Sequence, residues 1–131
     1  MRAHTASPCL AVADVAPFRD FLVEQFGARV IFDCGWYVNL SLGEAGATLQ
    51  FMTPPGAGAR LDGLAGITLN FDVDDVDAEH ARLRARGLPE AMALDDHPWG
   101  DRGFAVAGPG GLLLYVYSPR PPSPEFAEFF R

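Results

Sequence analysis

A short pattern occurs twice along the chain, as Leu10-Ala-Val-Ala-Asp-Val15 and as Phe71-Asp-Val-Asp-Asp-Val76. In both copies apolar side chains alternate with other residues up to an aspartate, Asp14 or Asp75, and a helical pattern begins directly after it. Such alternation is typical of a strand that buries one face. An aspartate at this point can accept hydrogen bonds from the unpaired N–H groups of the first helical turn. Each copy therefore predicts a strand followed by a helix.

Both predicted helices end at a glycine. The first runs from about Val15 to Phe26, with large apolar side chains at helical spacing, and Gly27 follows it. The second runs from about Val76 to Arg86 and is followed by Gly87. Glycine readily adopts the left-handed conformation that commonly ends a helix. The glycines therefore mark the end of the strand-helix unit in each copy.

Short alternating segments after each helix are predicted as strands. In the first copy they are Val30 to Phe32, Trp36 to Leu42 and Thr48 to Met52, and in the second Phe104 to Ala107 and Leu112 to Tyr117, with Met92 to Leu94 as a weaker candidate. The copies also end alike, at Thr48-Leu-Gln-Phe-Met-Thr-Pro54 and Leu113-Leu-Tyr-Val-Tyr-Ser-Pro119. The chain is therefore predicted to contain two βαβββ modules.

The 131 residues are predicted to form a single domain from these modules. Module 1 covers about residues 5–54, a linker rich in glycine and proline covers 55–65, and module 2 covers about 66–119. A tail helix is predicted over about 123–131, with Ser123 as its capping residue. Its phenylalanines favour docking on the body of the protein or on a partner subunit.

The composition excludes several classes of protein. Ten Lys and Arg residues stand against 17 Asp and Glu residues, which gives a formal net charge of −7 and disfavours nucleic acid as a partner. A hydrophobic fraction of 49% argues against disorder. No apolar stretch is long enough to cross a membrane, and no signal peptide is recognisable. We therefore expect a cytoplasmic protein in which Cys9 and Cys34 stay reduced.

The repeat and two further motifs resemble one known family. His97-Pro-Trp-Gly-Asp-Arg-Gly-Phe104 and Gly108-Pro-Gly-Gly-Leu-Leu-Leu-Tyr115, together with the two modules, are similar to the glyoxalase/bleomycin resistance/extradiol dioxygenase superfamily, also called the vicinal oxygen chelate fold. The resemblance implies an α+β fold in which two βαβββ modules form a curved mixed sheet around a cavity, with the helices outside. It also implies a homodimer, because many members form dimers.

The resemblance also implies where a metal would be held. Metal enzymes of this family place ligands at the start of each module's first strand and on each final strand, which correspond here to Ser7, Gln50, Thr68 and Tyr115. None of these is His, Asp or Glu, whereas a catalytic metal normally has about three good protein ligands. We therefore expect no metal and no other cofactor, although a shift in the register of the first strand would bring His4 into the site.

Strand alternation divides the side chains into two faces without reference to the family. One face is apolar and is predicted to meet the helices; it contains Leu10, Val12, Leu49, Phe51, Leu69, Phe71, Val73, Leu112, Leu114 and Val116. The other mixes aromatic rings with polar groups, which would be costly in a dry core but suit a small-molecule site. The residues predicted to contact a ligand are Trp99, Tyr115, Tyr117, Phe104, Asn70, Asp72, Gln50, Tyr37 and His97.

These observations favour a metal-free protein of the bleomycin-resistance type, which binds a small organic molecule and protects by sequestration. The negative charge favours a cationic ligand, and the rings favour an aromatic one. One alternative is an enzyme of the same superfamily: a metal-dependent lyase or dioxygenase, or a metal-free isomerase or hydrolase that uses Asp72 or His97. Another is an interaction module whose sheet face is covered by a second protein. No catalytic residue is assigned.

Overall fold

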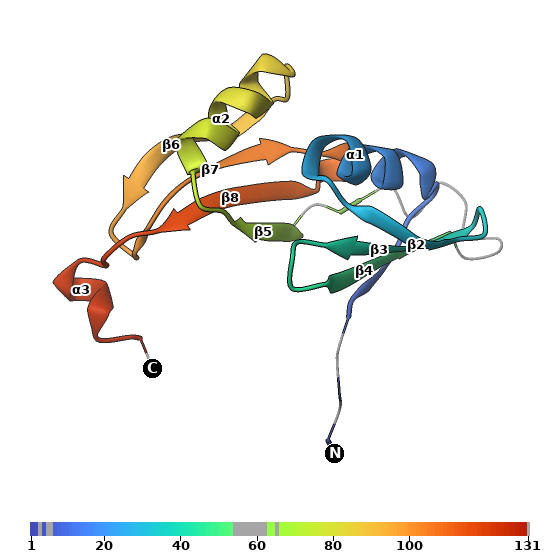
Figure 1. Ribbon diagram of the computed structural model, residues 1–131, viewed down its shortest axis with the longest axis horizontal. Coiled ribbons are helices and arrows are strands. Elements are labelled where there is room, and N and C mark those ends of the chain that lie inside the picture. The colour runs from blue at the N-terminus through green and yellow to red at the C-terminus, as the bar shows by residue number, and fades with distance from the viewer. Residues whose placement is uncertain (3, 5–6, 54–62, 65, 131) are drawn as a thin grey trace. The chain divides into compact units, whose positions relative to one another are not determined.

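The computed structural model describes residues 1–2, 4, 7–53, 63–64 and 66–130 (Figure 1). The chain divides into two compact units, residues 1–63 and 64–131, and each contains a four-stranded mixed sheet with helices. The predicted linker at 55–65 falls largely outside the described residues. The α+β class and the repeated βαβββ order are confirmed.

The first unit contains one helix and four strands. Its elements are β1 (Cys9–Ala11), α1 (Ala16–Phe26), β2 (Arg29–Asp33), β3 (Tyr37–Leu42) and β4 (Ala47–Met52). The strand order is β1-β4-β3-β2, with β1 parallel to β4 and the other neighbours antiparallel. The predicted segments are therefore present, with small differences at their ends.

Helix α1 forms where the repeat predicted it. The carboxylate of Asp14 accepts a hydrogen bond from the N–H of Ala16 at 3.1 Å, and Gly27 ends the helix at a φ of 66°. Phe18 is buried and stacks on Phe51 of β4, with ring centroids 5.0 Å apart. The helix thus covers the apolar face of its sheet.

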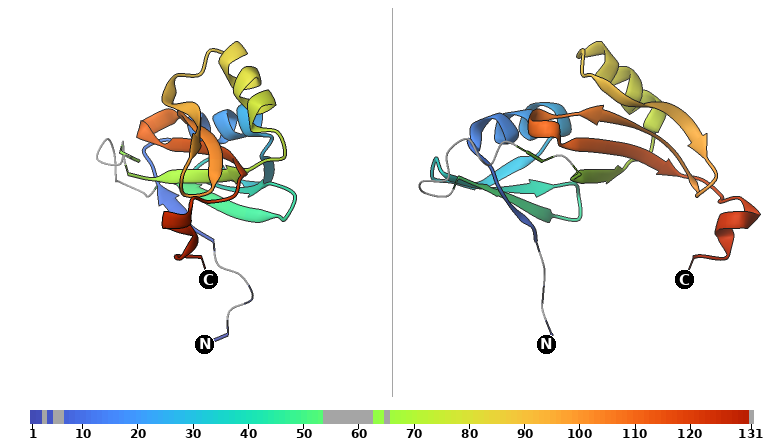
Figure 2. Two further views of the ribbon diagram at one scale, coloured as in Figure 1. Left: turned by 90° about the vertical axis from the view of Figure 1, so that its left-hand side faces the viewer. Right: turned by 180° about the vertical axis from the view of Figure 1, so that it is seen from behind.

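The second unit repeats this arrangement and adds a C-terminal turn. Its elements are β5 (Thr68–Asp72), α2 (Val76–Ala85), β6 (Glu90–His97), β7 (Asp101–Ala107), β8 (Leu113–Pro119) and α3 (Pro124–Ala127). The order is β5-β8-β7-β6, with β5 parallel to β8. The weak strand candidate at 92–94 is the centre of the longer strand β6. Figure 2 shows α2 over one face of this sheet.

The start of α2 is held by β8 as well as by the repeated aspartate. Asp75 accepts a hydrogen bond from the N–H of Ala78 at 3.0 Å. Ser118 of β8, only 2% exposed, accepts from the N–H of Val76 at 3.2 Å and donates to the carbonyl oxygen of Val73 at 2.6 Å. These bonds satisfy backbone groups that a helix start leaves unpaired. They fix the helix on its sheet.

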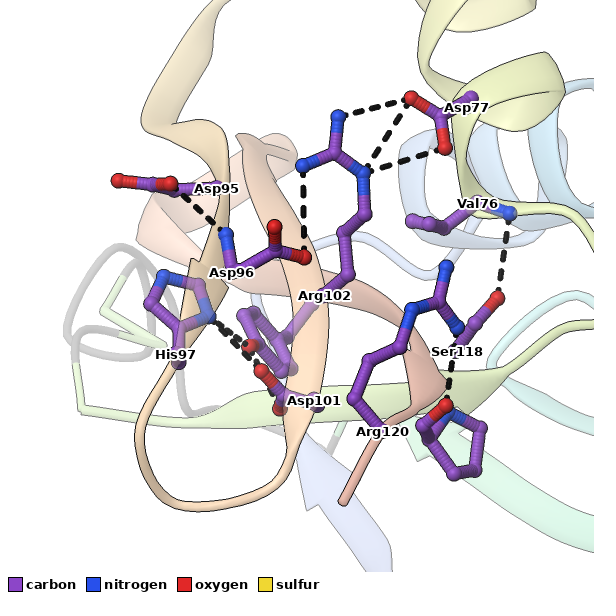
Figure 3. A network of polar contacts seen from close by, with 11 residues as sticks. Val76, Asp77, Asp95, Asp96, His97, Asp101, Arg102, Ser118 and Arg120 are labelled. Atoms are coloured by element: carbon purple, nitrogen blue, oxygen red, sulfur yellow. Dashed lines mark hydrogen bonds and ion pairs between the residues drawn. The ribbon is translucent and has the colours of Figure 1, made fainter. Parts of the chain in front are cut away.

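An ion pair on the same side links α2 to β7 (Figure 3). The Arg102 guanidinium donates to both carboxylate oxygens of Asp77, at 2.9 Å for the shortest contact, and lies 3.5 Å from Asp96. The hydrogen bond from Arg102 lowers the pKa of Asp77. The pair is exposed, so we expect a small contribution to stability.

The apolar face predicted from alternation forms the core of each unit. Val12, Leu49, Phe51, Leu112, Leu114 and Val116 are all at most 2% exposed. The prediction is confirmed for these six residues, whereas Leu10, Leu69, Phe71 and Val73 are half-buried. Gln50, Tyr115 and Tyr117 alternate with the buried residues and lie on the opposite, open face.

Phe104 is the exception, because its predicted orientation is wrong. It is fully buried, and its ring meets His80 of α2 edge-on at a centroid distance of 4.8 Å. Phe104 pairs with Val116, which belongs to the helix-covered face. The open-face positions on either side are Gly103, which has no side chain, and Ala105, which has only a methyl group. They provide no polar alternation that could reveal the orientation of β7.

The C-terminal tail differs from the predicted helix over 123–131. Among the described residues 123–130 only Pro124–Ala127 is helical, and the Ser123 side chain makes no capping bond. The carbonyl oxygen of Ser123 instead accepts from the N–H groups of Phe126 and Ala127. The tail is held to its unit by a backbone bond from Ser123 to Pro98 at 2.9 Å. No helix in the described part of the chain has the length and apolar character of a membrane span.

Candidate ligand-binding surface

The open face of the second sheet brings polar and aromatic side chains into register. β5 and β8 pair Asn70 with Tyr115 and Asp72 with Tyr117, and β6 and β7 pair His97 with Asp101. Asn70 and Asp72 are exposed, whereas the two tyrosines are half-buried. We call this surface, made of these six residues and Trp99, the open face of the second unit.

Asp101 is the centre of a hydrogen-bonded cluster at one end of this face. One carboxylate oxygen lies 2.8 Å from Nδ1 of His97, and the other accepts the hydroxyl of Tyr115 at 2.8 Å. The Tyr115 hydroxyl also lies 3.3 Å from Nδ1 of His97. The side chains of His97 and Asp101 are only 12% and 10% exposed. The cluster is thus a nearly buried group of three ionisable side chains from three strands.

Aromatic stacking extends the cluster in two directions. The Trp99 ring lies parallel to the His97 ring, with centroids 4.3 Å apart and an interplanar angle of 7°. Tyr117 stacks on Tyr115 at 5.8 Å and 21°. Trp99 is nevertheless 42% exposed. The face therefore presents aromatic surface to solvent while the polar atoms beneath it are held in place.

Gly103 makes room for this arrangement. A Cβ atom at Gly103 would lie 2.5 Å from the Tyr115 hydroxyl oxygen and 2.7 Å from its ring carbon Cζ. Side-chain contacts this short do not occur, so the Tyr115 ring reaches Asp101 by crossing β7 at a residue without a side chain. Gly103 is a site residue that the sequence did not reveal.

The environment of Tyr115 keeps its hydroxyl protonated. Burial and the hydrogen bond to Asp101 raise the pKa of Tyr115 to about 12. Burial disfavours the phenolate, and a neighbouring carboxylate would repel it. Tyr115 therefore donates a hydrogen bond throughout the neutral pH range.

The first unit has a smaller polar cluster on its own open face. The Gln50 side chain accepts from the Ser7 hydroxyl at 3.1 Å and donates to Asn39 at 3.0 Å. Tyr37 lies next to two exposed rings, Phe32 at 5.9 Å and Trp36 at 6.2 Å between centroids.

The structure thus groups most of the predicted ligand residues, but not all of them. The open face of the second unit contains Asn70, Asp72, His97, Trp99, Tyr115 and Tyr117. Gln50 and Tyr37 belong to the first unit, and Phe104 is in the core. Asp101 was missed, although it lies within the His97-to-Phe104 motif, because β7 was predicted to begin only at Phe104. A strand that begins at Asp101 places that residue opposite His97.

The model of the Glyoxalase/Bleomycin resistance protein/Dioxygenase superfamily matches residues 2–116. The chain belongs to this superfamily. An uncharacterised protein of Mycobacterium tuberculosis H37Rv is 33% identical over 121 residues, which cover 80% of this chain and 68% of that protein.

Solved structures of the superfamily share the fold. A glyoxalase/bleomycin resistance protein/dioxygenase from Nocardioides has a TM-score of 0.73 at 18% identity, and covers 92% of this chain and 85% of its own. The bleomycin resistance determinant of transposon Tn5 has a TM-score of 0.63 at 20% identity, with 89% and 98% covered. TnmS3, an antibiotic binding protein from Streptomyces sp. CB03234, has a TM-score of 0.69 at 27% identity, with 90% and 97% covered.

The residues at the superfamily's metal positions do not fit a catalytic divalent cation. Both ends of the Gln50 amide are occupied by Ser7 and Asn39. Thr68 offers a neutral hydroxyl, and Tyr115 retains its proton. Catalytic metals are held by imidazole, thiolate and carboxylate groups. No group of three or more His, Cys, Asp or Glu that could hold a metal is found among the described residues.

Proposed function

We propose that the protein binds a small aromatic molecule on the open face of the second unit, without a metal, and acts by sequestering it. The observation that carries this proposal is the partly exposed Trp99 stacked on His97, beside the Tyr115–Tyr117 pair. Flat rings offer large contact area at low entropic cost. A ring that stacks against them would also meet the polar atoms of the Asp101 cluster.

The charge of the protein supports a cationic or neutral ligand over an anionic one. The formal net charge is −7, and the exposed Asp72 lies on the open face itself. A negative field raises the local concentration of cations and repels anions. We therefore propose a small organic ligand that carries an aromatic ring and no negative charge.

Two structural relatives support sequestration of an antibiotic. TnmS3 is described as an antibiotic binding protein, and the Tn5 protein as a bleomycin resistance determinant. The residues at the metal positions also support a binding protein of this kind, because they do not suit a catalytic metal. A ligand on the open face would then be bound by stacking and hydrogen bonds.

The test is a calorimetric screen of the whole protein against bleomycin-like glycopeptides, mitomycins and small 2-oxo metabolites, with and without chelator. We expect an aromatic hit whose affinity persists in chelator and falls at least about tenfold in Trp99→Ala, since a buried stacking ring contributes on the order of a tenfold change or more. Trp36→Ala is the matched control, because Trp36 is also exposed, at 55% against 42% for Trp99, but belongs to the first unit. Hits that all require added metal would refute the proposal and support the enzyme alternative.

A further inference from the structure

The neighbours of His97 determine which of its ring nitrogens carries hydrogen. Nδ1 lies 2.8 Å from a carboxylate oxygen of Asp101. An ionised carboxylate can only accept hydrogen bonds, so Nδ1 must be the donor. The Tyr115 hydroxyl donates to the other carboxylate oxygen and does not compete for this position. In the neutral imidazole the lone pair is therefore on Nε2.

The His97 ring is also held in one orientation. Trp99 covers one of its faces at 4.3 Å, and the side chain is only 12% exposed. Figure 3 shows the second ring nitrogen directed away from Asp101, with no interaction drawn to it. Within the described residues no hydrogen bond to Nε2 is formed. The protein thus fixes an acceptor nitrogen at the edge of the aromatic surface and leaves it unpaired.

We propose that the ligand carries a hydroxyl group of the phenol or enol type, which donates a hydrogen bond to Nε2 of His97. This inference rests on the proposed function and adds to it the polar group that the surface recognises. The rings of Trp99, Tyr115 and Tyr117 stack against the aromatic part of the ligand. Nε2 of His97 then accepts a hydrogen bond from a donor on the same ring system.

The surrounding charges favour a neutral hydroxyl over an acid. Asp101 lies beside His97, and Asp72 is on the same face. A carboxylate ligand would meet both negative charges, whereas a phenol or enol brings a proton and no charge. A site with an unpaired acceptor also discriminates against a ligand without the donor, because such a ligand displaces water from the acceptor without replacing its hydrogen bond.

The experiment compares three probes of one shape, 2-naphthol, 2-methoxynaphthalene and naphthalene, by calorimetry. We expect the unmodified protein to bind 2-naphthol about tenfold more tightly than 2-methoxynaphthalene. His97→Phe keeps a ring next to Trp99 but has no nitrogen, so the ratio between the two probes should fall to about one. Asp101→Asn should also remove the preference. Its amide can donate a hydrogen bond to Nδ1, which favours the tautomer with the ring hydrogen on Nε2. Trp36→Ala should keep the full ratio.

Nitrogen NMR of the unmodified protein tests the same inference without any variant. In the neutral imidazole we expect the nitrogen chemical shift of Nε2 in His97 to be that of an unprotonated nitrogen. A protonated Nε2, or equal affinity for 2-naphthol and 2-methoxynaphthalene, would overturn the inference. If none of the three probes binds but Nε2 is unprotonated, the proposed aromatic site fails while the assigned acceptor stands.

Discussion

Tyr115 and Gly103 depend on one another at the residue scale. The tyrosine reaches Asp101 only because β7 has no side chain where the ring crosses it. Burial of the ring, together with this hydrogen bond to Asp101, raises the pKa of the Tyr115 hydroxyl to about 12. The titration of Tyr115 therefore reports whether its ring lies beside Asp101.

We expect Tyr115 to titrate at about 12 in ultraviolet absorption, which follows ionisation directly, rather than at the ordinary tyrosine value of about 10. Tyr115→Phe should remove that late component. Gly103→Ala should move it back toward about 10, because the added methyl group displaces the ring from Asp101. Gly63→Ala is the control, since a Cβ there meets nothing within 4 Å. An unchanged titration in Gly103→Ala would contradict the argument.

The same shift has a consequence for stability with a defined sign. The folded protein keeps the Tyr115 proton up to about 12, whereas an unfolded tyrosine loses it near 10. The folded state thus binds more protons between these values, so stability decreases as the pH rises through this window. Below it, the contribution of the protonated phenol is fully present.

At the element scale, the attachment of α2 to its sheet depends on a buried serine. Ser118 pairs with the N–H of Val76 and the carbonyl oxygen of Val73. The Ser123 hydroxyl, in contrast, is buried and has no hydrogen-bond partner among the described residues. Both side chains are buried serine hydroxyls, but that of Ser118 is hydrogen-bonded and that of Ser123 is not.

Ser118→Ala should therefore lower the free energy of unfolding by about 1–3 kcal/mol, because it leaves buried backbone groups unpaired. Ser123→Ala should leave it unchanged or raise it slightly, because the desolvated hydroxyl gains nothing from being present. Urea denaturation of both variants measures the difference. Equal destabilisation by the two substitutions would show that the Ser118 bonds contribute nothing specific.

At the scale of the whole molecule, the first sheet ends in an exposed edge. β2 is the outer strand, and its consecutive residues Val30, Ile31 and Phe32 are 47%, 56% and 52% exposed. Exposed apolar edge strands promote association with another chain. On this basis we propose that the protein forms a homodimer.

Sedimentation at micromolar concentration should accordingly give twice the monomer mass of 14.1 kDa. Ile31→Lys places a charge on the edge and should shift the equilibrium toward the monomer. Ala45→Lys provides a control with the same change in charge, since Ala45 is exposed in the turn between β3 and β4. A monomer of the unmodified protein under these conditions would refute the dimer.

The repeated pattern around Asp14 and Asp75 was sufficient to predict two βαβββ units, both helices and the apolar face of each sheet. These features depend on hydrophobic alternation, on helical spacing and on the glycines that end the helices. Residues close together in the sequence determine all three signals. The superfamily could likewise be inferred from the order of the motifs. The same alternation placed Asn70, Asp72, Tyr115 and Tyr117 on one face.

The orientation of Phe104, the role of Asp101 and the space provided by Gly103 were decided only by tertiary structure. Each depends on the register between β6, β7 and β8, which determines what lies opposite or across a strand. Where the open-face residues of β7 are glycine and alanine, hydrophobic alternation carries no information about that register. The repeat thus determined the elements and their buried faces, whereas strand pairing determined which polar atoms meet, because such contacts join residues far apart in the sequence.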